Sequence, residues 1–257
     1  MELNFAQATA FVGSLIWPFI RIGAMIMAMP VIGTRLVTIR IKIIIAMVIS
    51  ILILPLIPPV PAVEALSFAG LMITVQQILI GVATGFTLQL VMGALTIAGE
   101  SIALSMGLGF ASMIDPANGV NVPVISQLFL IMGTLLFLAL GGHLLLFQLL
   151  VSSFNSLPIG VEGITRESFW LIVQWGSQMF VGAVWIAIPA LLSMLMITIA
   201  MGVMTRAAPQ LNIFSVGFPV TMFMGFIILM LVLPTFLQRF NQLMLDAMQL
   251  SQKIAGL

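Results

Sequence analysis

Charged side chains are too sparse along this chain to cover a water-facing surface. Only 6% of its 257 residues are charged, whereas 62% are hydrophobic. Soluble domains are about 45–50% apolar and about 25% charged. The outer surface must therefore contact lipid or the equally apolar flanks of partner subunits. These proportions predict an all-α membrane-assembly protein that folds as a single helical unit over residues 1–257.

Six apolar segments divide the chain. They cover residues 11–29, 43–57, 71–98, 128–150, 180–203 and 216–236. A helix needs about 20 apolar residues to cross a hydrocarbon core of about 30 Å, and the last three segments meet this length. The second is marginal, while glycine and glutamine residues interrupt the third. We therefore expect helical hairpins with broken helices, and after Pro234 an amphipathic helical tail at the surface over residues 237–257.

The stretch at residues 100–123 is too irregular for a membrane span, yet it remains moderately apolar. It contains Gly107, Gly109, Asp115-Pro116 and Asn118-Gly119, which are turn-forming residues. Irregular backbone at membrane depth persists only where it is buried in protein or lines a cavity. We therefore expect an irregular apolar loop in one of these two settings.

Arg21 lies inside the first apolar segment. A charge at such a position is costly unless it is paired or faces a polar cavity. A carboxylate on another helix or the carbonyls of a broken helix could satisfy it, and a place on a conduction path is the alternative. Glu100 and Asp115 are the other candidates for deep charges, although Asp115 can also form an ordinary Asx turn.

His143 follows Gly141-Gly142 in an apolar run and is the single histidine of the chain. No cysteine is present, so His143 cannot join a metal site built from several His or Cys ligands. We interpret it as a hydrogen-bonded interior histidine, with a role in a proton or gating event as the alternative.

Methionine is unusually frequent, with 20 residues. Its unbranched thioether fills irregular gaps and adapts to changing surfaces. Core filling is the first interpretation, and a deformable seal around an opening is the second. The methionines near the expected breaks or in the fifth segment are Met106, Met113, Met179, Met194, Met196, Met201 and Met204.

Two further patterns concern packing. Gly81 and Gly85 are four residues apart, which permits close approach of another helix. Because tyrosine is absent, any aromatic belt at a membrane interface must come from the tryptophans, Trp17, Trp170, Trp175 and Trp185.

An enzymatic function has almost no support. The sequence contains no Walker loop, no GxSxG or HExxH motif and no paired-carboxylate site with a partner base. The net charge is +1, without a long basic run, so nothing indicates binding to nucleic acid. We expect no catalytic residue, no metal and no cofactor. A secondary transporter should show two matching halves with ion-binding residues, which we do not find.

One joint carries a specific motif. It reads Arg206-Ala-Ala-Pro209-Gln210-Leu-Asn212-Ile-Phe214 and is followed by Gly217 and Pro219. This resembles the R-x-x-P-Q-x-N-x-F signature of the FliR family of flagellar export proteins. Pieces in the same order as in the family agree, namely Arg21, Pro30-Val-Ile-Gly33, Gly85, Gly99-Glu100, Asp115-Pro116 and Gly141-Gly142-His143.

The resemblance implies a core subunit of the type III secretion export gate, in the bacterial inner membrane within the flagellar basal body. With FliP-like and FliQ-like subunits it would form the channel for unfolded export substrates, with FlhB-like and FlhA-like proteins associated. Residues 1–180 would be FliP-like and residues 181–236 a FliQ-like hairpin. The helices would be raised out of the bilayer, in contact with neighbours as well as lipid. An injectisome export-gate homologue is the alternative.

The resemblance also assigns residues. The loop after the third segment would be a plug in the channel, formed by Met106, Gly107, Leu108, Gly109, Phe110, Met113, Ile114, Asp115 and Pro116. Structural or assembly roles would fall to Arg21, Gly142, His143, Arg206, Pro209, Gln210 and Asn212. Pro209 ends a helix because it lacks a backbone donor. The polar side chains around it would then bond the freed backbone groups and hold a fixed bend.

Overall fold

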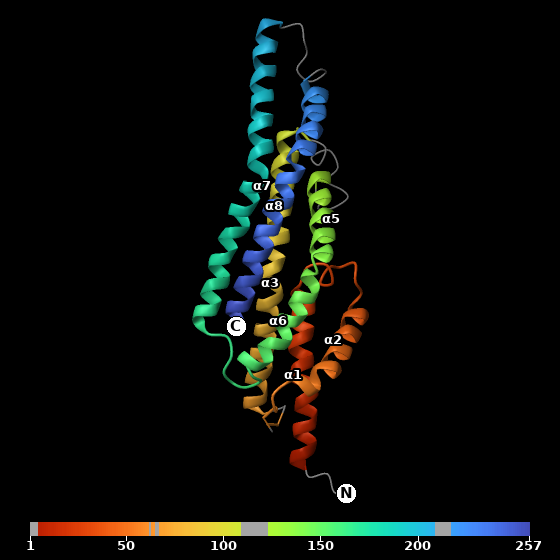
Figure 1. Ribbon diagram of the computed structural model, residues 1–257, viewed down its shortest axis with the longest axis vertical. Coiled ribbons are helices and arrows are strands. Elements are labelled where there is room, and N and C mark those ends of the chain that lie inside the picture. The colour runs from red at the N-terminus through yellow and green to blue at the C-terminus, as the bar shows by residue number, and fades with distance from the viewer. Residues whose placement is uncertain (1–4, 62, 65–66, 109–122, 209–216) are drawn as a thin grey trace. The chain divides into compact units, whose positions relative to one another are not determined.

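Helices account for all the regular structure that the computed structural model describes (Figure 1). The structure describes residues 5–61, 63–64, 67–108, 123–208 and 217–257, with side chains from residue 13 onward. The elements are α1 (Phe5–Ala28), α2 (Ile39–Ile53), the 3₁₀ turn η1 (Leu54–Leu56), α3 (Phe68–Ser105), α5 (Val124–Ala139), α6 (Gly142–Ser156), α7 (Arg166–Ala207) and α8 (Phe218–Ile254). The all-α prediction is confirmed.

Four described helical segments are long and apolar enough to cross a membrane, namely Ile39–Leu56, Phe68–Ser105, Arg166–Ala207 and Phe218–Ile254. The fourth predicted segment is instead a broken one. Its two helices, α5 and α6, are bent by 61° at the intervening residues. Gly141 has a φ of 70° there, a left-handed conformation that glycine adopts at little cost. The expected combination of long apolar segments and a broken helix is confirmed.

Helix α8 does not end at Pro234. A proline within a helix removes one hydrogen bond and costs about 3 kcal/mol or more, yet α8 continues to Ile254. Phe236 and Phe240, in the two turns after the proline, are almost fully buried, and this burial offsets the cost. The residues predicted to form a separate tail are thus the end of one long helix.

The chain divides into two compact units that interleave along the sequence. Unit 1 comprises Met1–Leu90, Leu136–Gly176 and Met244–Leu257, and unit 2 comprises Val91–Leu135 and Ser177–Leu243. Several helices therefore contribute one end to each unit. The FliP-like and FliQ-like parts stay a prediction.

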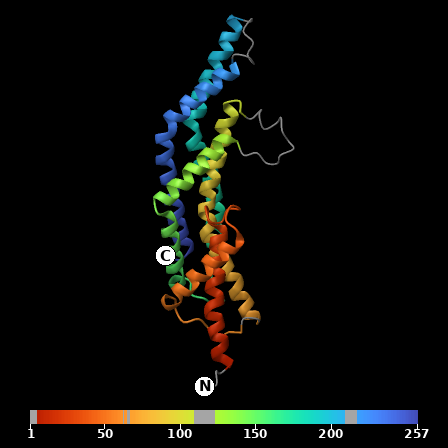
Figure 2. The same cartoon turned by 90° about the vertical axis from the view of Figure 1, so that its right-hand side faces the viewer.

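In unit 1, α1 and the first half of α3 run side by side in both views (Figure 1, Figure 2). Two glycines make this contact possible. A Cβ atom on Gly81 would lie 2.3 Å from the carbonyl oxygen of Arg21, and one on Gly85 would lie 2.8 Å from that of Met25. Real Cβ contacts are longer than 3.0 Å. The helix contact predicted from the Gly81-x-x-x-Gly85 spacing is therefore confirmed.

Unit 2 has an aromatic core. The ring centroids of Phe129 and Phe236 are 4.8 Å apart, and those of Phe236 and Phe240 are 6.3 Å apart. The start of α5 closely approaches α3, because a Cβ on Gly99 would lie 2.5 Å from Cα of Ser126. The Ser126 hydroxyl donates to the Thr96 carbonyl over 3.0 Å.

Candidate functional site

Arg21 is completely buried in unit 1 and makes four hydrogen bonds. Its Nε donates to Gln77 Oε1 over 2.7 Å. One terminal nitrogen donates to the Ser153 carbonyl and hydroxyl, over 3.0 and 3.2 Å. The other donates to the Leu157 carbonyl over 2.8 Å. One side chain of α1 is thus bonded to α3 and to the end of α6.

These carbonyls lie at the C-terminal end of α6. The Ser153 carbonyl also accepts from the Leu157 amide over 2.9 Å, and the Leu157 carbonyl belongs to the residue that follows the helix. The last four carbonyls of a helix accept no hydrogen bond from an amide of the same helix, so they need other donors. A cation at this end also complements the helix dipole. Arg21 therefore caps α6 from another helix. Its guanidinium carbon also lies 4.2 Å from the ring centroid of Phe154, a favourable cation–π distance. Of the two partners expected for Arg21, a carboxylate and backbone carbonyls, the described residues provide carbonyls, here at the end of α6, together with an amide and a hydroxyl oxygen.

Gln77 and Ser153 are partners that the sequence interpretation did not identify. Gln77 is fully buried, and its Nε2 has no hydrogen-bond partner among the described residues. An unpaired buried donor costs about 1–3 kcal/mol. The hydrogen bond that the Gln77 side-chain oxygen accepts from Arg21 offsets this cost. A glutamine inside an apolar segment could have been recognised as the partner of a buried cation, but the serine offered no comparable signal.

More polar side chains are buried in the same unit. The hydroxyls of Thr87 and Ser251 form a hydrogen bond between α3 and the end of α8. The Trp175 indole donates to the Thr87 carbonyl over 3.2 Å, and Gln76 Oε1 accepts from the Ile164 amide over 3.2 Å. Unit 1 thus has hydrogen bonds inside it that join helices distant in sequence.

The tryptophans do not act alike. Trp17 is fully buried, with its indole nitrogen 3.3 Å from the Thr74 hydroxyl, so it is not available to an interfacial belt. Trp170 and Trp185 are 61% and 51% exposed. Trp185 also packs under Arg239, whose guanidinium carbon is 4.9 Å from the ring centroid.

His143 is only partly consistent with an interior hydrogen-bonded histidine. Its Nδ1 is buried but has no hydrogen-bond partner in the described part of the chain. The imidazole instead meets the edge of Phe137, with centroids 6.4 Å apart. Gly142 makes room for this phenylalanine, because a Cβ there would lie 2.5 Å from its ring. Ring packing, rather than a hydrogen bond of Nδ1, holds His143 in place.

Arg206 lies in the last turn of α7, exposed, where its charge complements the helix dipole. The helix ends at Ala207, two residues before Pro209. This agrees with the expected effect of a proline, which disfavours helix in the residue before it. Pro209, Gln210 and Asn212 lie outside the described residues, so the proposed bonds around the joint stay a prediction.

Three of the predicted plug residues, Met106, Gly107 and Leu108, are described, and they directly follow α3, which ends at Ser105, in unit 2. The Leu108 amide donates to the Ala103 carbonyl and the Gly107 amide to the Leu104 carbonyl, each over 3.0 Å. With a φ of 81° at Gly107, this pattern is a Schellman C-cap. The other predicted plug residues, Gly109, Phe110, Met113, Ile114, Asp115 and Pro116, lie outside the described residues.

Met106 is fully buried against α8. A Cβ on Gly225 would lie 2.6 Å from its Cγ and Cε, so the methionine fills the space that this glycine leaves. Met106 therefore anchors the start of the loop within unit 2. Met194 is also buried, whereas Met196 is 70% exposed. Met194 is thus an example of core filling, and the deformable seal around an opening stays a prediction. Glu100, expected to be deep, is exposed instead.

The outer surface carries large apolar side chains along whole helices. Only 17% of the apolar segment Ile39–Leu56 is buried. On α8, Phe223, Met230 and Leu231 are each between 66% and 76% exposed. Contiguous apolar surface of this extent marks contact with lipid or protein. Among the described residues, no three His, Cys, Asp or Glu side chains gather to hold a metal ion.

Comparison with known proteins gives a consistent match along most of the chain. Residues 12–247 match the sequence profile of the family described as bacterial export proteins, family 1. The flagellar biosynthetic protein FliR of Escherichia coli (strain K12) is 38% identical over 234 residues, covering 91% of this chain and 89% of that protein. FliR of Pectobacterium carotovorum is 40% identical with the same coverage. FliR of Aquifex aeolicus is 33% identical over 224 residues, 87% of this chain and 86% of that protein.

The matched region contains the buried arginine, the broken pair α5–α6 and the joint after α7. The relatives named above are all called FliR, and the matches cover most of their length. This chain belongs to the FliR family of bacterial flagellar export proteins.

Proposed function

We propose that this protein is a core subunit of the flagellar type III export gate. In this role it forms, with FliP-like and FliQ-like subunits, the channel through which unfolded export substrates pass. FlhB-like and FlhA-like proteins associate with this assembly. The assembly lies in the bacterial inner membrane within the flagellar basal body, with helices raised out of the bilayer, and the protein performs no chemical reaction.

The observation that carries this proposal is the distribution of polar and apolar side chains. Unit 1 buries Arg21, Gln77, Ser153 and Ser251, while Ile44 and Leu52 of α2 are 61% and 68% exposed. An apolar surface of this kind is unfavourable in water. Contact with lipid alone would not require so many hydrogen bonds between buried side chains. Subunits with apolar flanks would cover the exposed helices while the bonds inside keep this chain in one shape.

The loop that begins at Met106 is the proposed gate of the channel. Its start is fixed, because Met106 is buried against Gly225 and Gly107 caps α3. Apolar residues in a narrow passage exclude water and therefore ions. The side chains of Leu108, Phe110, Met113 and Ile114 supply such a surface, and flexible methionines can part for a passing chain.

Copurification tests the assembly. The tagged full chain is expressed with and without FliP-like and FliQ-like partners from the same organism, and its abundance and size are followed in mild detergent. We expect a stable hetero-oligomer with the partners and rapid loss of the chain without them, because the exposed apolar helices are then uncovered. A long-lived, monodisperse monomer or homo-oligomer would contradict the proposal and favour a transporter.

A further inference from the structure

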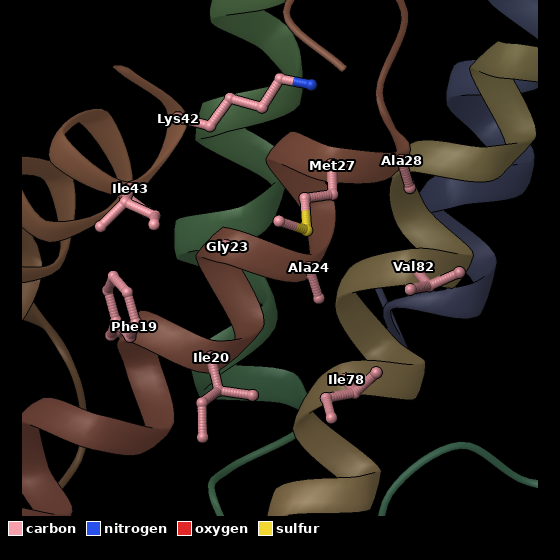
Figure 3. A pocket seen from close by; sticks show the side chains of 11 residues that line it. Phe19, Ile20, Gly23, Ala24, Met27, Ala28, Lys42, Ile43, Ile78 and Val82 are labelled. Atoms are coloured by element: carbon pink, nitrogen blue, oxygen red, sulfur yellow. The ribbon is translucent and has the colours of Figure 1, made fainter. Parts of the chain in front are cut away.

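A groove of about 550 Å³ lies between α1, α2 and α3 in unit 1 (Figure 3). Apart from Lys42, every residue that lines it is apolar or glycine. Its lining includes the small residues Gly23, Ala24, Ala28 and Ala46 as well as larger side chains such as Phe19 and Val82. Small residues where two helices meet leave the space unfilled. The groove therefore suits a slender apolar ligand.

The dimensions of the groove match one leaflet of a membrane. Its lining extends along α1 from Phe19 to Ala28, which at about 1.5 Å per residue is about 14 Å. Half of a hydrocarbon core of about 30 Å is about 15 Å. An acyl chain lying along α1 would therefore fit between the middle of a bilayer and its surface.

One end of the groove carries Lys42, and two further basic residues, Arg35 and Arg40, are near it in the sequence. Lys42, Met27 and Ala28 lie at one end, and Ile20 and Ile78 lie at the other (Figure 3). Arg40, in the first turn of α2, and Arg35, in the preceding connection, are both exposed. Residues 3–63 contain no Asp or Glu, so no nearby carboxylate in the sequence neutralises these charges.

The basic end is held in a defined shape. Lys42 Nζ donates to the carbonyls of Gly33 and Thr34, each over 2.9 Å, and the Gly33 amide donates to the Met29 carbonyl over 3.1 Å. This turn includes Val31 at a φ of 71°, which is a strained conformation for a β-branched residue. The ammonium of Lys42 has three N–H donors, and these two bonds leave one for an anionic group.

We propose that this groove binds one acyl chain of an anionic phospholipid, whose phosphate headgroup lies at Lys42, Arg40 and Arg35. Basic pockets between helices at a membrane surface recognise anionic headgroups in this way. The bound lipid fills the gap between α1 and α2 and supplies the negative charge that this part of the chain lacks. The inference rests on the membrane location given under the proposed function, but not on the channel. It requires that the parts of α1, α2 and α3 that line the groove lie within the bilayer and are not among the raised helices.

Photo-crosslinking with lipid tests the site. The purified complex is reconstituted into vesicles that contain phosphatidylglycerol or phosphatidylcholine with the same diazirine-bearing acyl chain, and labelled peptides are mapped. We expect phosphatidylglycerol to label peptides that contain Phe19–Ala28 and Ile78–Val82. The double variant Arg35→Gln/Arg40→Gln keeps the Lys42 bonds and should lower this labelling at least about tenfold, since each basic side chain near an anionic surface contributes about fivefold in binding.

Two further variants isolate the groove. Gly23→Leu should abolish labelling by both lipids, because a Cβ on Gly23 meets nothing closer than the Ala46 Cβ at 4.0 Å and the leucine would extend into the free space. The matched control, Arg166→Gln/Lys253→Gln, removes two exposed charges elsewhere in unit 1 and should leave labelling unchanged. Copurification with the partners verifies that each variant assembles.

The possible results separate the two proposals. Equal labelling by phosphatidylcholine and phosphatidylglycerol would overturn the inference, because the basic end would then not select the headgroup. So would absent labelling of an intact complex, which would indicate that a neighbouring subunit covers the groove. Absence of the chain from the membrane fraction, measured before reconstitution, would instead contradict the proposed function.

Discussion

A single buried guanidinium connects three helices of unit 1. Arg21 donates hydrogen bonds to Gln77 on α3 and to carbonyls at the end of α6. At an exposed helix end, water molecules donate these bonds. The charge is dispersed over four bonds and an aromatic ring. A buried arginine of this kind is a structural group whose removal uncovers several acceptors at once.

Replacing Arg21 should therefore destabilise the fold. Arg21→Ala removes the donor of the Gln77 side-chain oxygen and of the Leu157 carbonyl. Each loss costs about 1–3 kcal/mol, against a total stability of about 5–15 kcal/mol. We expect little assembled protein. Arg21→Lys keeps the charge but lacks the planar fork, and should give an intermediate melting temperature in detergent.

The control for this prediction is Arg166→Ala, which removes an exposed arginine from the first turn of α7. It should leave the melting temperature nearly unchanged. If Arg21→Ala assembled and melted normally but failed to export protein, the residue would belong to a conduction path, and its structural assignment would be incorrect.

At the scale of helices, glycines decide where α1 and α3 touch. Gly81→Ala would place a methyl group 2.3 Å from the Arg21 carbonyl oxygen, a backbone atom that cannot rotate away. The helices must separate, and overpacking of this kind costs about 1–3 kcal/mol. We expect a lower melting temperature of the purified complex.

Gly176→Ala on α7 is the matched control. No atom lies within 4 Å of a Cβ at this position, and alanine is about 0.5–1 kcal/mol better than glycine in a helix. The variant should be as stable as the parent or slightly more so. Equal losses in both variants would indicate that the Gly81 contact contributes little.

The joint after α7 is a second feature at this scale. Arg206 is exposed at the end of that helix, so Arg206→Ala should affect assembly more than the stability of the chain itself. Loss of a paired polar group of about 1.4 kcal/mol corresponds to about tenfold less assembled complex. Quantitative copurification with FliP-like subunits measures this, with Arg166→Ala at the other end of α7 as the control. Full assembly with lost export would assign Arg206 to transport instead.

At the scale of the whole molecule, the loop after α3 should control leakage. Deleting residues 109–113 keeps Met106 and the Gly107 cap, so the anchor within unit 2 is retained. We expect the assembled complex to leak ions across vesicles several-fold faster, with normal copurification. The measurement is ion flux, and Met106→Ala, which opens a cavity against Gly225, serves as the comparison for a packing defect.

Normal flux through a fully assembled deletion variant would show that the loop packs against neighbours and does not close a passage. A leak in Met106→Ala equal to that of the deletion would attribute the closure to core packing at the end of α3. Only a leak specific to the deletion supports the gate.

The interior features that followed from the sequence are local. Helix α7 ends at Ala207, two residues before Pro209 in the sequence, as expected before a proline. The break between α5 and α6 was not predicted, although Gly141 permits its left-handed residue. Gly81 and Gly85 lie on one face at helical spacing, so their contact was also predictable. The helices, the end of α7 and the apolar outside depend on neighbouring residues or on composition, which the sequence displays directly.

The tertiary structure decided which residues meet across the chain. Arg21 and Ser153 are 132 positions apart, and nothing local distinguishes that serine from others. The burial of Trp17, the exposure of Glu100 and the passage of α8 through Pro234 likewise depend on what packs around them. The sequence by itself determined an all-α chain with an apolar exterior and its family, because these follow from composition, spacing and motif. The hydrogen-bond partners of Arg21 and the groove at Lys42 form only when distant helices pack together. Each depends on side chains that several helices contribute.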